Sequence, residues 1–569
     1  MSTRLANHGR LINRSKAIKF TFNGKVMTGF EGDSLAASLL ANDQMLMGRS
    51  FKYHRPRGVV ASGGEEPNAL MNLGAEGHFE PNARATTTET FGGLTATSQN
   101  HFPSLEFDVG AINSKLARFL PAGFYYKMFI HPRSFWKHVY EPIIRKSAGL
   151  GRAPKARDSD KYEHYYHFCE VMIVGGGIAG LQAAKSAAAT GVRVLLVEQT
   201  AHWGGRAPVD GATIDGISAE DWVHETVVAL SACENVVIRH RTQGAGVYDH
   251  GYALAYERIA DHTPGDGRPR HRLWRVRCKQ IITATGAIER PLSFAGNDIP
   301  GVMLASAVRD YVVNYAVSPG DRTVVVTNND DAYRTALRLK KAGLDVPVIL
   351  DARAEGGGVL MAEAIAVGIR VELGRGIAKV IGSKRVTGVQ ICAQAGEGAV
   401  LEEIGCDVVA MSGGWSPVVH LWSHCGGKLF WDVDQAMFRP DPDKPPLGID
   451  GAGFVRVAGL ANGHLRSASC MVDAAIQGTA AAYNATGKVK KIKTAEAKDA
   501  EEVPLSPVWL MPQGASYKLR SKAWLDFQND VKVSDVQLAA QEGFESVEHA
   551  KRYTTLGMAT DQGKLSNIN

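Results

Sequence analysis

The fold is decided by one stretch, Val171-Met-Ile-Val-Gly-Gly-Gly-Ile-Ala-Gly-Leu181. An apolar run of strand length leads into Gly175, Gly177 and Gly180, which have GxGxxG spacing. An alanine-rich stretch of helical length and a second apolar run, residues 192–197, follow. Strand, tight turn, helix and strand in this order predict a βαβ unit that binds a dinucleotide.

Each part of this unit has its own task. Gly175 permits the turn, Gly177 lets the backbone approach a pyrophosphate, and Gly180 lets the helix pack closely on the strand. The N–H groups at the helix start then hold the negative charge. Glu198, at the end of the second strand, is placed to accept the hydroxyls of an adenosine ribose. The alternative is a Rossmann-like unit that has lost its ligand.

Two further segments are candidates for contact with the dinucleotide. Gly204 and Gly205 lie just past the second strand, followed by Arg206, which is either a phosphate ligand or a surface arginine. A later apolar run ends in an Ala-Thr-Gly turn that contains Thr285 and Gly286. Two-dinucleotide-domain flavoprotein reductases place such a turn where the chain crosses to their second nucleotide domain.

A second βαβ unit is predicted from strands at 323–327 and 346–351 and a helix at 333–342. Its turn, residues 328–331, reads Asn-Asn-Asp-Asp and contains no glycine. Two acids at a helix N-terminus would repel a pyrophosphate. We therefore expect this second unit to be structural.

The choice of dinucleotide rests on the segment Gly459-Leu-Ala-Asn462. Flavin-binding members of this architecture usually carry Gly-Asp here, and the aspartate bonds the FAD. Because this chain has no acid at that position, we favour NAD over FAD. NADP is disfavoured because Glu198 would repel its 2′-phosphate.

Composition bounds the class of protein. A chain of 569 residues should hold three or four domains. No run of about 18 uncharged apolar residues is present, so we expect no membrane span. Seven cysteines occur singly and never as CxxC, which predicts neither a metal site nor a redox pair. Isolated thiols fit a reducing compartment, and we expect a cytoplasmic protein.

The net charge of +6 is concentrated near the start of the chain. Residues 1–60 contain ten Lys and Arg against three acids, and the segment 49–58 interleaves basic and aromatic residues. This segment is either a solvated loop or a surface for a phosphate or an acidic partner. We expect no nucleic acid, because no nucleic-acid fold signature accompanies it.

We expect an α/β protein with a two-dinucleotide-domain, flavoprotein-reductase-like core. An Asn-Gly hairpin over residues 17–30 and a helix at 34–42 predict an N-terminal β-grasp domain. The expected parts are a β-grasp, ferredoxin-like domain (1–104), an irregular helical connector that wraps other domains (105–160), an NAD-binding Rossmann-type domain (161–322 and 408–484), the second nucleotide-binding-like domain (323–407), a linker (485–521) and a small helical module (522–569).

Segments along the whole chain resemble the N-terminal part of the alpha subunit of heterotetrameric sarcosine oxidase. They are Gly48–Gly58, Glu65–Leu70, the GxGxxG segment, Ala284–Pro291, Phe527–Val531 and Lys551–Lys564. The resemblance implies oxidative demethylation of sarcosine or a related secondary amine together with a beta subunit that holds FAD. It further implies NAD on this chain, an FMN at the alpha/beta interface, and gamma and delta subunits as further partners.

Related dehydrogenase subunits bind a [2Fe–2S] cluster in similar terminal modules, but this chain lacks the ligands. Residues 1–168 contain no cysteine. In the C-terminal module, Asp526 and Gln528 occupy the place of a Cys-x-Cys pair, and Asp561 that of a third cysteine. We therefore expect both modules to keep their shape without iron.

The C-terminal module also offers a set of candidates for the phosphate of the interface FMN. They are Lys551, Arg552, Thr554, Thr555 and Lys564. Cations and hydroxyls together suit a phosphate. The alternative is that Lys551 and Arg552 form only the basic last turn of a helix.

The resemblance has one main departure. Alpha subunits of this family continue into a folate-binding, aminomethyltransferase-like domain, whereas this sequence stops at Asn569, so the folate chemistry cannot be assigned to it. No catalytic acid, base or nucleophile is identified, because the chemistry would lie in cofactors and partner. Two alternatives stay open: a free-standing FAD- and NAD(P)H-dependent reductase, and a non-catalytic assembly scaffold.

Overall fold

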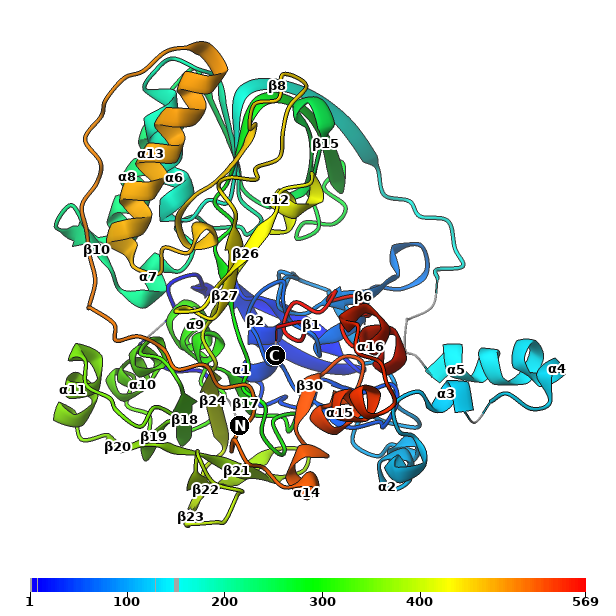
Figure 1. Ribbon diagram of the computed structural model, residues 1–569. Coiled ribbons are helices and arrows are strands. Elements are labelled where there is room, and N and C mark those ends of the chain that lie inside the picture. The colour runs from blue at the N-terminus through cyan, green and yellow to red at the C-terminus, as the bar shows by residue number, and fades with distance from the viewer. Residues whose placement is uncertain (1–2, 8, 128, 148–152, 569) are drawn as a thin grey trace. The chain divides into compact units, whose positions relative to one another are not determined.

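The computed structural model describes residues 3–7, 9–127, 129–147 and 153–568, which divide into two compact units (Figure 1). Unit 1 comprises Met1–Ser159, Glu289–Gly414 and Glu502–Asn569, and unit 2 comprises Asp160–Ile288 and Trp415–Glu501. Residues 289–322, which we expected with the first Rossmann-type domain, belong to unit 1. None of the helices in the described part of the chain is long and apolar enough to cross a membrane.

The predicted hairpin and helix at the start of unit 1 are confirmed. Strands β1 (Asn13–Phe22) and β2 (Lys25–Glu31) pair antiparallel, and both turn residues, Asn23 and Gly24, have positive φ. Helix α1 (Leu35–Ala41) follows, and its N-cap Ser34 accepts the N–H of residue 37. The sheet has the order β2-β1-β7-β5-β6, completed by β5 (Leu70–Leu73), β6 (Glu80–Arg84) and β7 (Thr95–Thr97).

The second predicted βαβ unit is also present in unit 1. Its parallel sheet has the order β17-β24-β18-β19-β20, from β17 (Val302–Leu304), β24 (Val408–Ser412), β18 (Thr323–Thr327), β19 (Val348–Asp351) and β20 (Arg370–Leu373). The flanking helices are α9 (Ala305–Tyr315), α10 (Asp331–Lys341) and α11 (Val359–Ala366). An antiparallel sheet of β21 (Arg375–Gly382), β22 (Val386–Ala393) and β23 (Glu402–Gly405) completes this part. The strands are buried runs of β-branched residues, as parallel sheets require.

The C-terminal module of unit 1 is held by the basic segment near the start of the chain. The module contains β30 (Trp524–Asp526), β31 (Val531–Lys532), α15 (Val533–Gln541) and α16 (Val547–Thr554). Arg55 donates to Asp530 and Asp298, with both N–O distances 2.6 Å, and Arg57 donates to backbone carbonyls of the module. Arg49, Arg55 and Arg57 are all buried. The segment 49–58 is therefore neither a solvated loop nor an open phosphate surface, because its arginines are buried and form hydrogen bonds with other segments of unit 1.

The connector divides into two parts with different surroundings. Residues 112–127 contact the C-terminal module: the buried Ala122 packs with Ala539 and Tyr553. Residues 129–147 instead project from unit 1, as the cyan helices α4 (Arg133–Phe135) and α5 (Glu141–Ser147) show in Figure 1. Many apolar side chains of this projection are exposed, in contrast to the buried Ala122 of the preceding part.

Unit 2 is built on one sheet, with the order β12-β9-β8-β15-β14-β13 and β28 beside β15. Its strands are β8 (Tyr162–Val174), β9 (Val194–Val197), β12 (Val236–Arg239), β13 (Thr242–Tyr248), β14 (Tyr252–Arg258), β15 (His271–Thr283) and β28 (Val455–Val457). The pairs β12–β9, β9–β8, β8–β15 and β15–β28 are parallel, and helices α6 (Ile178–Ala188), α8 (Ala219–Ser231) and α13 (Ser467–Thr486) accompany them. Small side chains of α6 and α13 let these helices pack closely: a Cβ at Gly478 would lie 2.4 Å from the carbonyl oxygen of Ala183.

We predict that Arg55→Ala destabilises unit 1 by about 3–5 kcal/mol, because it removes the cation that is paired with the buried Asp530 carboxylate. Denaturant titration of the full chain measures the loss. Lys16→Ala, which removes an exposed ion pair with Glu31, is the matched control and should leave the midpoint unchanged. Equal midpoints for both variants would contradict the role given to Arg55.

Candidate dinucleotide site

In the turn between β8 and α6, protein atoms pack closely against two of the three glycines and leave free space at the third. A Cβ built on Gly175, where φ is +111°, would lie 2.2 Å from the carbonyl oxygen of Ala284, and one on Gly180 would lie 1.8 Å from that of Gly175. At Gly177 the nearest atom is 3.9 Å away, the Cα of Gly205. The protein therefore leaves space in front of Gly177, at the N-terminus of α6, where a pyrophosphate would lie.

Glu198 lies next to this turn, as its position after β9 predicts. Its Oε2 accepts the N–H of Gly176 at 2.7 Å, and its Oε1 accepts the N–H and hydroxyl of Thr200 at 2.8 and 2.9 Å. Burial raises the pKa of this carboxyl above its usual value. The side chain ties the glycine turn to the segment after β9, and its Oε2 retains a lone pair for a ribose hydroxyl.

The segment that contains the predicted glycine pair adjoins the same turn. The N–H of Gly204 donates to the carbonyl of Gly176 at 2.9 Å, and Gly205 has a φ of +56°. Arg206 pairs with Asp210 at 3.1 Å, and its guanidinium lies 5.2 Å from the ring centroid of Trp415. The structure thus brings the glycine pair to the site, while the charge of Arg206 is balanced by Asp210.

The Ala-Thr-Gly turn completes one side of the site. Ala284 faces Gly175, and the hydroxyl of Thr285 donates to the carbonyl of Val418 at 2.6 Å. Gly286 has a φ of +71°, and its carbonyl accepts the N–H of Val418 at 2.9 Å. Thr285 therefore positions the turn through backbone contacts.

Asp473 is a residue near this site that sequence reasoning missed. Its buried carboxylate, on α13, accepts the N–H of Gly459 at 2.7 Å, the amide of Asn462 at 3.2 Å and that of Gln477 at 3.1 Å. A carboxylate therefore does stand beside Gly459, although it comes 14 residues later in the chain. The spacing of Asp473 and Gln477, one helical turn apart, was the only sequence signal for it.

A hollow of about 440 Å³ opens beside Asp473 along the first half of α13. Its walls are His464, Ala468, Ser469, Val472, Asp473 and Ile476. None of the cofactor residues predicted from the sequence lines it. We therefore do not place the dinucleotide in this hollow.

The turn of the second βαβ unit, in unit 1, is filled by its own charged side chains. Arg353 lies 2.6 Å from both Asp330 and Asp351, and Tyr333 donates to Asp351 at 2.9 Å. All four residues are buried. Both acids that we expected to repel a pyrophosphate are instead paired inside the protein, Asp330 with Arg353 and Asp331 with Arg309.

A strap, residues 502–506, runs across the same turn. The N–H of Val503 donates to Asp330 at 2.8 Å, and Ser506 and Asn328 exchange two hydrogen bonds of 2.8 and 3.2 Å. In open α/β sheets a dinucleotide binds at the carboxyl ends of the strands, where this turn lies. The strap occupies that position in unit 1.

In the C-terminal module, the three residues that we matched with cluster ligands, Asp526, Gln528 and Asp561, lie close together. Asp526 accepts backbone N–H groups of its own turn and of Gly557, the latter at 2.8 Å. Gln528 accepts the N–H of Asp561 at 3.0 Å and donates to Thr560 at 2.6 Å. Burial and the nearby Asp561 raise the pKa of Asp526 to about 6. Side-chain hydrogen bonds thus join the two segments that a cluster would join.

The candidates for the FMN phosphate are divided by the structure. The hydroxyls of Thr554 and Thr555 donate to carbonyls at 2.7 and 2.5 Å, so neither offers its proton to a phosphate. Lys551 and Arg552 lie in the last turn of α16. Lys564 is half-buried, and burial together with the nearby Arg84 lowers its pKa.

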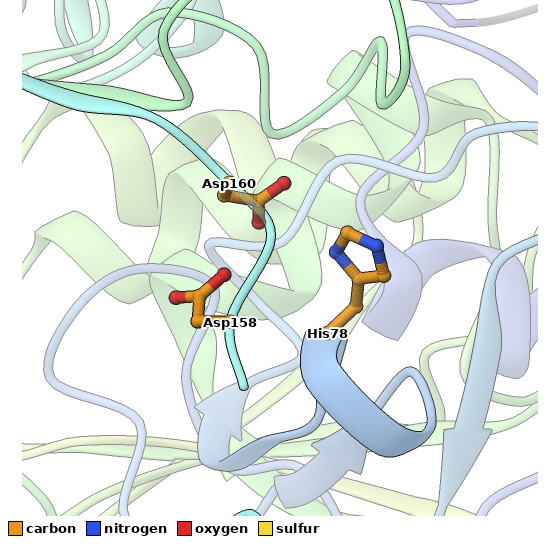
Figure 2. A group of neighbouring side chains, drawn as sticks. All are labelled: His78, Asp158 and Asp160. Atoms are coloured by element: carbon orange, nitrogen blue, oxygen red, sulfur yellow. The ribbon is translucent and has the colours of Figure 1, made fainter. Parts of the chain in front are cut away.

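Figure 2 shows three further polar side chains, His78, Asp158 and Asp160. His78 and Asp158 belong to unit 1, where Nε2 of His78 lies 3.0 Å from the hydroxyl of Ser159. Asp160 is the first residue of unit 2. Both carboxylates stand near the surface, and we assign no metal site to these residues.

Three family models match the chain. Residues 169–436 match the pyridine nucleotide-disulphide oxidoreductase model, 15–101 the 2Fe-2S iron-sulfur cluster binding domain, and 520–569 the sarcosine oxidase A3 domain. The first cysteine of the chain is Cys169, so the match over 15–101 includes no thiolate ligand.

Known proteins extend these matches. The sarcosine oxidase subunit alpha of Rhizobium meliloti (strain 1021) is 42% identical over 100% of this chain and 56% of its own length. That of Corynebacterium sp. (strain P-1) is 35% identical over 98% of this chain and 53% of its own length. The chain thus spans about half the length of these curated relatives.

The fold is also found in a solved structure, the L-proline dehydrogenase from P. horikoshii, with a TM-score of 0.64 and 19% identity over 98% of this chain and 92% of that one. This likeness concerns the fold alone. The sequence matches go further, since they run from the N-terminal domain to the last 50 residues. The chain is a homologue, over its whole length, of the sarcosine oxidase alpha subunits.

Proposed function

We propose that this chain is an oxidoreductase subunit that acts with a beta subunit in the oxidative demethylation of sarcosine or a related secondary amine. The observation that carries the proposal is the 42% identity to a sarcosine oxidase alpha subunit along the whole chain. Its own part is to bind and orient cofactors, since no residue of the candidate site is arranged as an acid, base or nucleophile. Gamma and delta subunits are further proposed partners.

The first cofactor in this proposal is NAD in unit 2. The open space at Gly177, the N–H groups at the start of α6 and the lone pair on Glu198 fit an adenosine diphosphate. A bound NAD would supply a nicotinamide ring able to exchange a hydride. The chain contributes a preformed turn, held by Glu198 and by the close packing of Gly175 on Ala284.

FAD is the second candidate for the same site, and Asp473 favours it. The absence of an acid directly after Gly459 favoured NAD. However, Asp473 of α13 places a carboxylate next to this turn. Oδ1 of Asp473 accepts two hydrogen bonds and Oδ2 accepts one, so Oδ2 retains a lone pair just as Oε2 of Glu198 does. We keep NAD as the proposal, because no acid directly follows Gly459, and FAD as its rival.

The strap weakens the alternative of a free-standing reductase. Such an enzyme needs a second nucleotide site, and residues 502–506 cover the place where unit 1 would offer one. The other alternative, a scaffold without activity, predicts the same fold and differs only in turnover. A complex that oxidises sarcosine, where neither subunit alone does so, would separate a working subunit from a scaffold.

The remaining cofactors of the proposal are FAD on the beta subunit and FMN between the subunits. For the FMN phosphate, the structure supports the cations Lys551, Arg552 and Lys564 rather than the two threonines. Half-burial of Lys564 beside Arg84 concentrates positive charge, and an anion there would relieve the repulsion. Cytoplasmic location remains a proposal.

We predict that heat releases NAD, and no FAD, from the purified full chain, because the glycine turn fits an adenine dinucleotide and no acid directly follows Gly459. Mass analysis of the supernatant identifies the nucleotide, and elemental analysis of the same sample should show no iron. Release of FAD alone would decide for the rival cofactor. Two irons with two acid-labile sulfides per chain would overturn the cluster-free interpretation.

We predict that Gly177→Val lowers the nucleotide content by ~10-fold or more, which corresponds to at least ~1.4 kcal/mol of lost affinity. The valine fills the space of the pyrophosphate but meets no protein atom at its Cβ within 3.9 Å. Gly92→Val, at another glycine with open surroundings, is the control and should retain the nucleotide. Full nucleotide content in Gly177→Val would place the ligand elsewhere.

We predict that Arg552→Ala combined with Lys564→Ala lowers the FMN content of a complex with a sarcosine-oxidase-type beta subunit. Each charge-assisted bond to a phosphate is worth ~1.5–3 kcal/mol. The control, Lys490→Ala with Lys491→Ala, removes two exposed cations from unit 2. Unchanged FMN content and turnover in the first variant would show that these cations do not hold the phosphate.

A further inference from the structure

The projection of unit 1, residues 129–147, has a surface unlike that of an ordinary connector. It consists of α4, a π-helical turn at Trp136–Tyr140 and α5, which follow one another without a break. We call these residues the arm. Figure 1 shows it extending away from α15 and α16, the helices of the module at its base.

The arm is ordered by contacts of its own. The ring of Tyr140 lies 5.1 Å from that of Phe129 and 6.1 Å from that of Phe135, and its hydroxyl donates to the carbonyl of His131 at 2.9 Å. Aromatic pairs at these distances are favourable. The arm therefore holds a defined shape without burying its outer face.

That outer face is apolar. Five large apolar side chains of the arm are between 38% and 60% exposed: Ile130, Phe135, Trp136, Val139 and Ile143. Trp136, Val139 and Ile143 recur at intervals of three and four residues, so these three share one side of the helical run. Contiguous exposed apolar surface of this kind marks an interaction site, and aromatic residues dominate the energetics of such sites.

The rim of this face is basic. The arm contains four Lys and Arg residues against one acid, Glu141. Arg133, Lys137 and Arg145 are exposed beside the apolar side chains. A partner that covers the arm should therefore combine an apolar groove with an acidic rim.

The base of the arm adjoins the module that we propose for the FMN phosphate. Lys127 lies 2.5 Å from Glu542, and Gly123 faces the ring of Tyr553 on α16. Lys551 and Arg552 stand on the same helix. A subunit that shares an FMN with α16 would thus lie within reach of the arm.

We propose that the arm docks in an acidic-rimmed apolar groove of the beta subunit and is a main anchor of the alpha/beta complex. The proposal rests on the proposed function, which supplies the partner. Trp136 and Ile143 fill the groove, and the surrounding cations steer the encounter. A lipid surface is the rival occupant, because basic helices with aromatic residues also bind membranes.

The test measures the dissociation constant between the full chain and the beta subunit of Rhizobium meliloti sarcosine oxidase. Trp136→Ser with Ile143→Ser should weaken binding ~30-fold or more, since two central anchors are lost. The control is Val433→Ser with Ile449→Ser, two exposed apolar residues of unit 2, which should bind as the parent does. Lys137→Glu with Arg145→Glu gives a second variant without apolar truncation, and its association should be slower at low salt.

The outcomes separate this proposal from the one on which it rests. Unchanged affinity in both arm variants, with a parent chain that binds, overturns the docking role and leaves the proposed function standing. A parent chain that does not bind the beta subunit overturns both. Sedimentation with phosphatidylcholine and phosphatidylglycerol vesicles that is lost in Trp136→Ser with Ile143→Ser, while affinity for the beta subunit is unchanged, identifies a lipid surface and overturns the docking role.

Discussion

The pairing of Arg55 with Asp530 and Asp298 is the interaction on which unit 1 depends. It joins residues that are 475 and 243 positions apart in the chain, inside the protein. Burial alone would raise the pKa of Asp530, but Arg55 and Arg57 outweigh it and lower the pKa. The guanidinium of Arg55 also lies 3.7 Å from the ring centroid of Trp524. The planar cation therefore contacts an aromatic ring as well as the two carboxylates.

This interaction bears on the expectation that the C-terminal module keeps its shape without a cluster. A metal cluster would fix its ligands by strong bonds, whereas Asp526 and Gln528 fix the same turn through several hydrogen bonds of ordinary strength. Such a turn needs external support, and Arg57 provides it by donating to the backbone carbonyls of residues 527 and 528. The module is held as much by the first sixty residues as by its own side chains.

Elements that arise from neighbouring residues were predictable from the sequence. The Asn23-Gly24 turn, the capped helix α1 and the closed packing at Gly175 and Gly180 follow from local stereochemistry. The burial of residues 49–58 did not, because the acids that neutralise Arg55 come from segments hundreds of residues away. Asp473 was not predicted for the same reason, because its helix brings the carboxylate to Gly459 only in the folded chain.

The strap shows why a motif has to be interpreted together with what covers it. The glycine-free turn of unit 1 indicated weak phosphate binding. Residues 502–506 also cover this turn, because they form hydrogen bonds with Asp330 and Asn328. Their sequence has no pattern that predicts this position, since a strap is held by backbone groups that every residue possesses. If the strap moved away, the N–H of Val503 would lose its hydrogen bond to Asp330, whereas Asp330 would keep its ion pair with Arg353. The chain itself therefore covers the turn of the second βαβ unit, whereas the glycine turn of unit 2 keeps open space in front of Gly177, and this contrast is the reason for proposing the dinucleotide in unit 2.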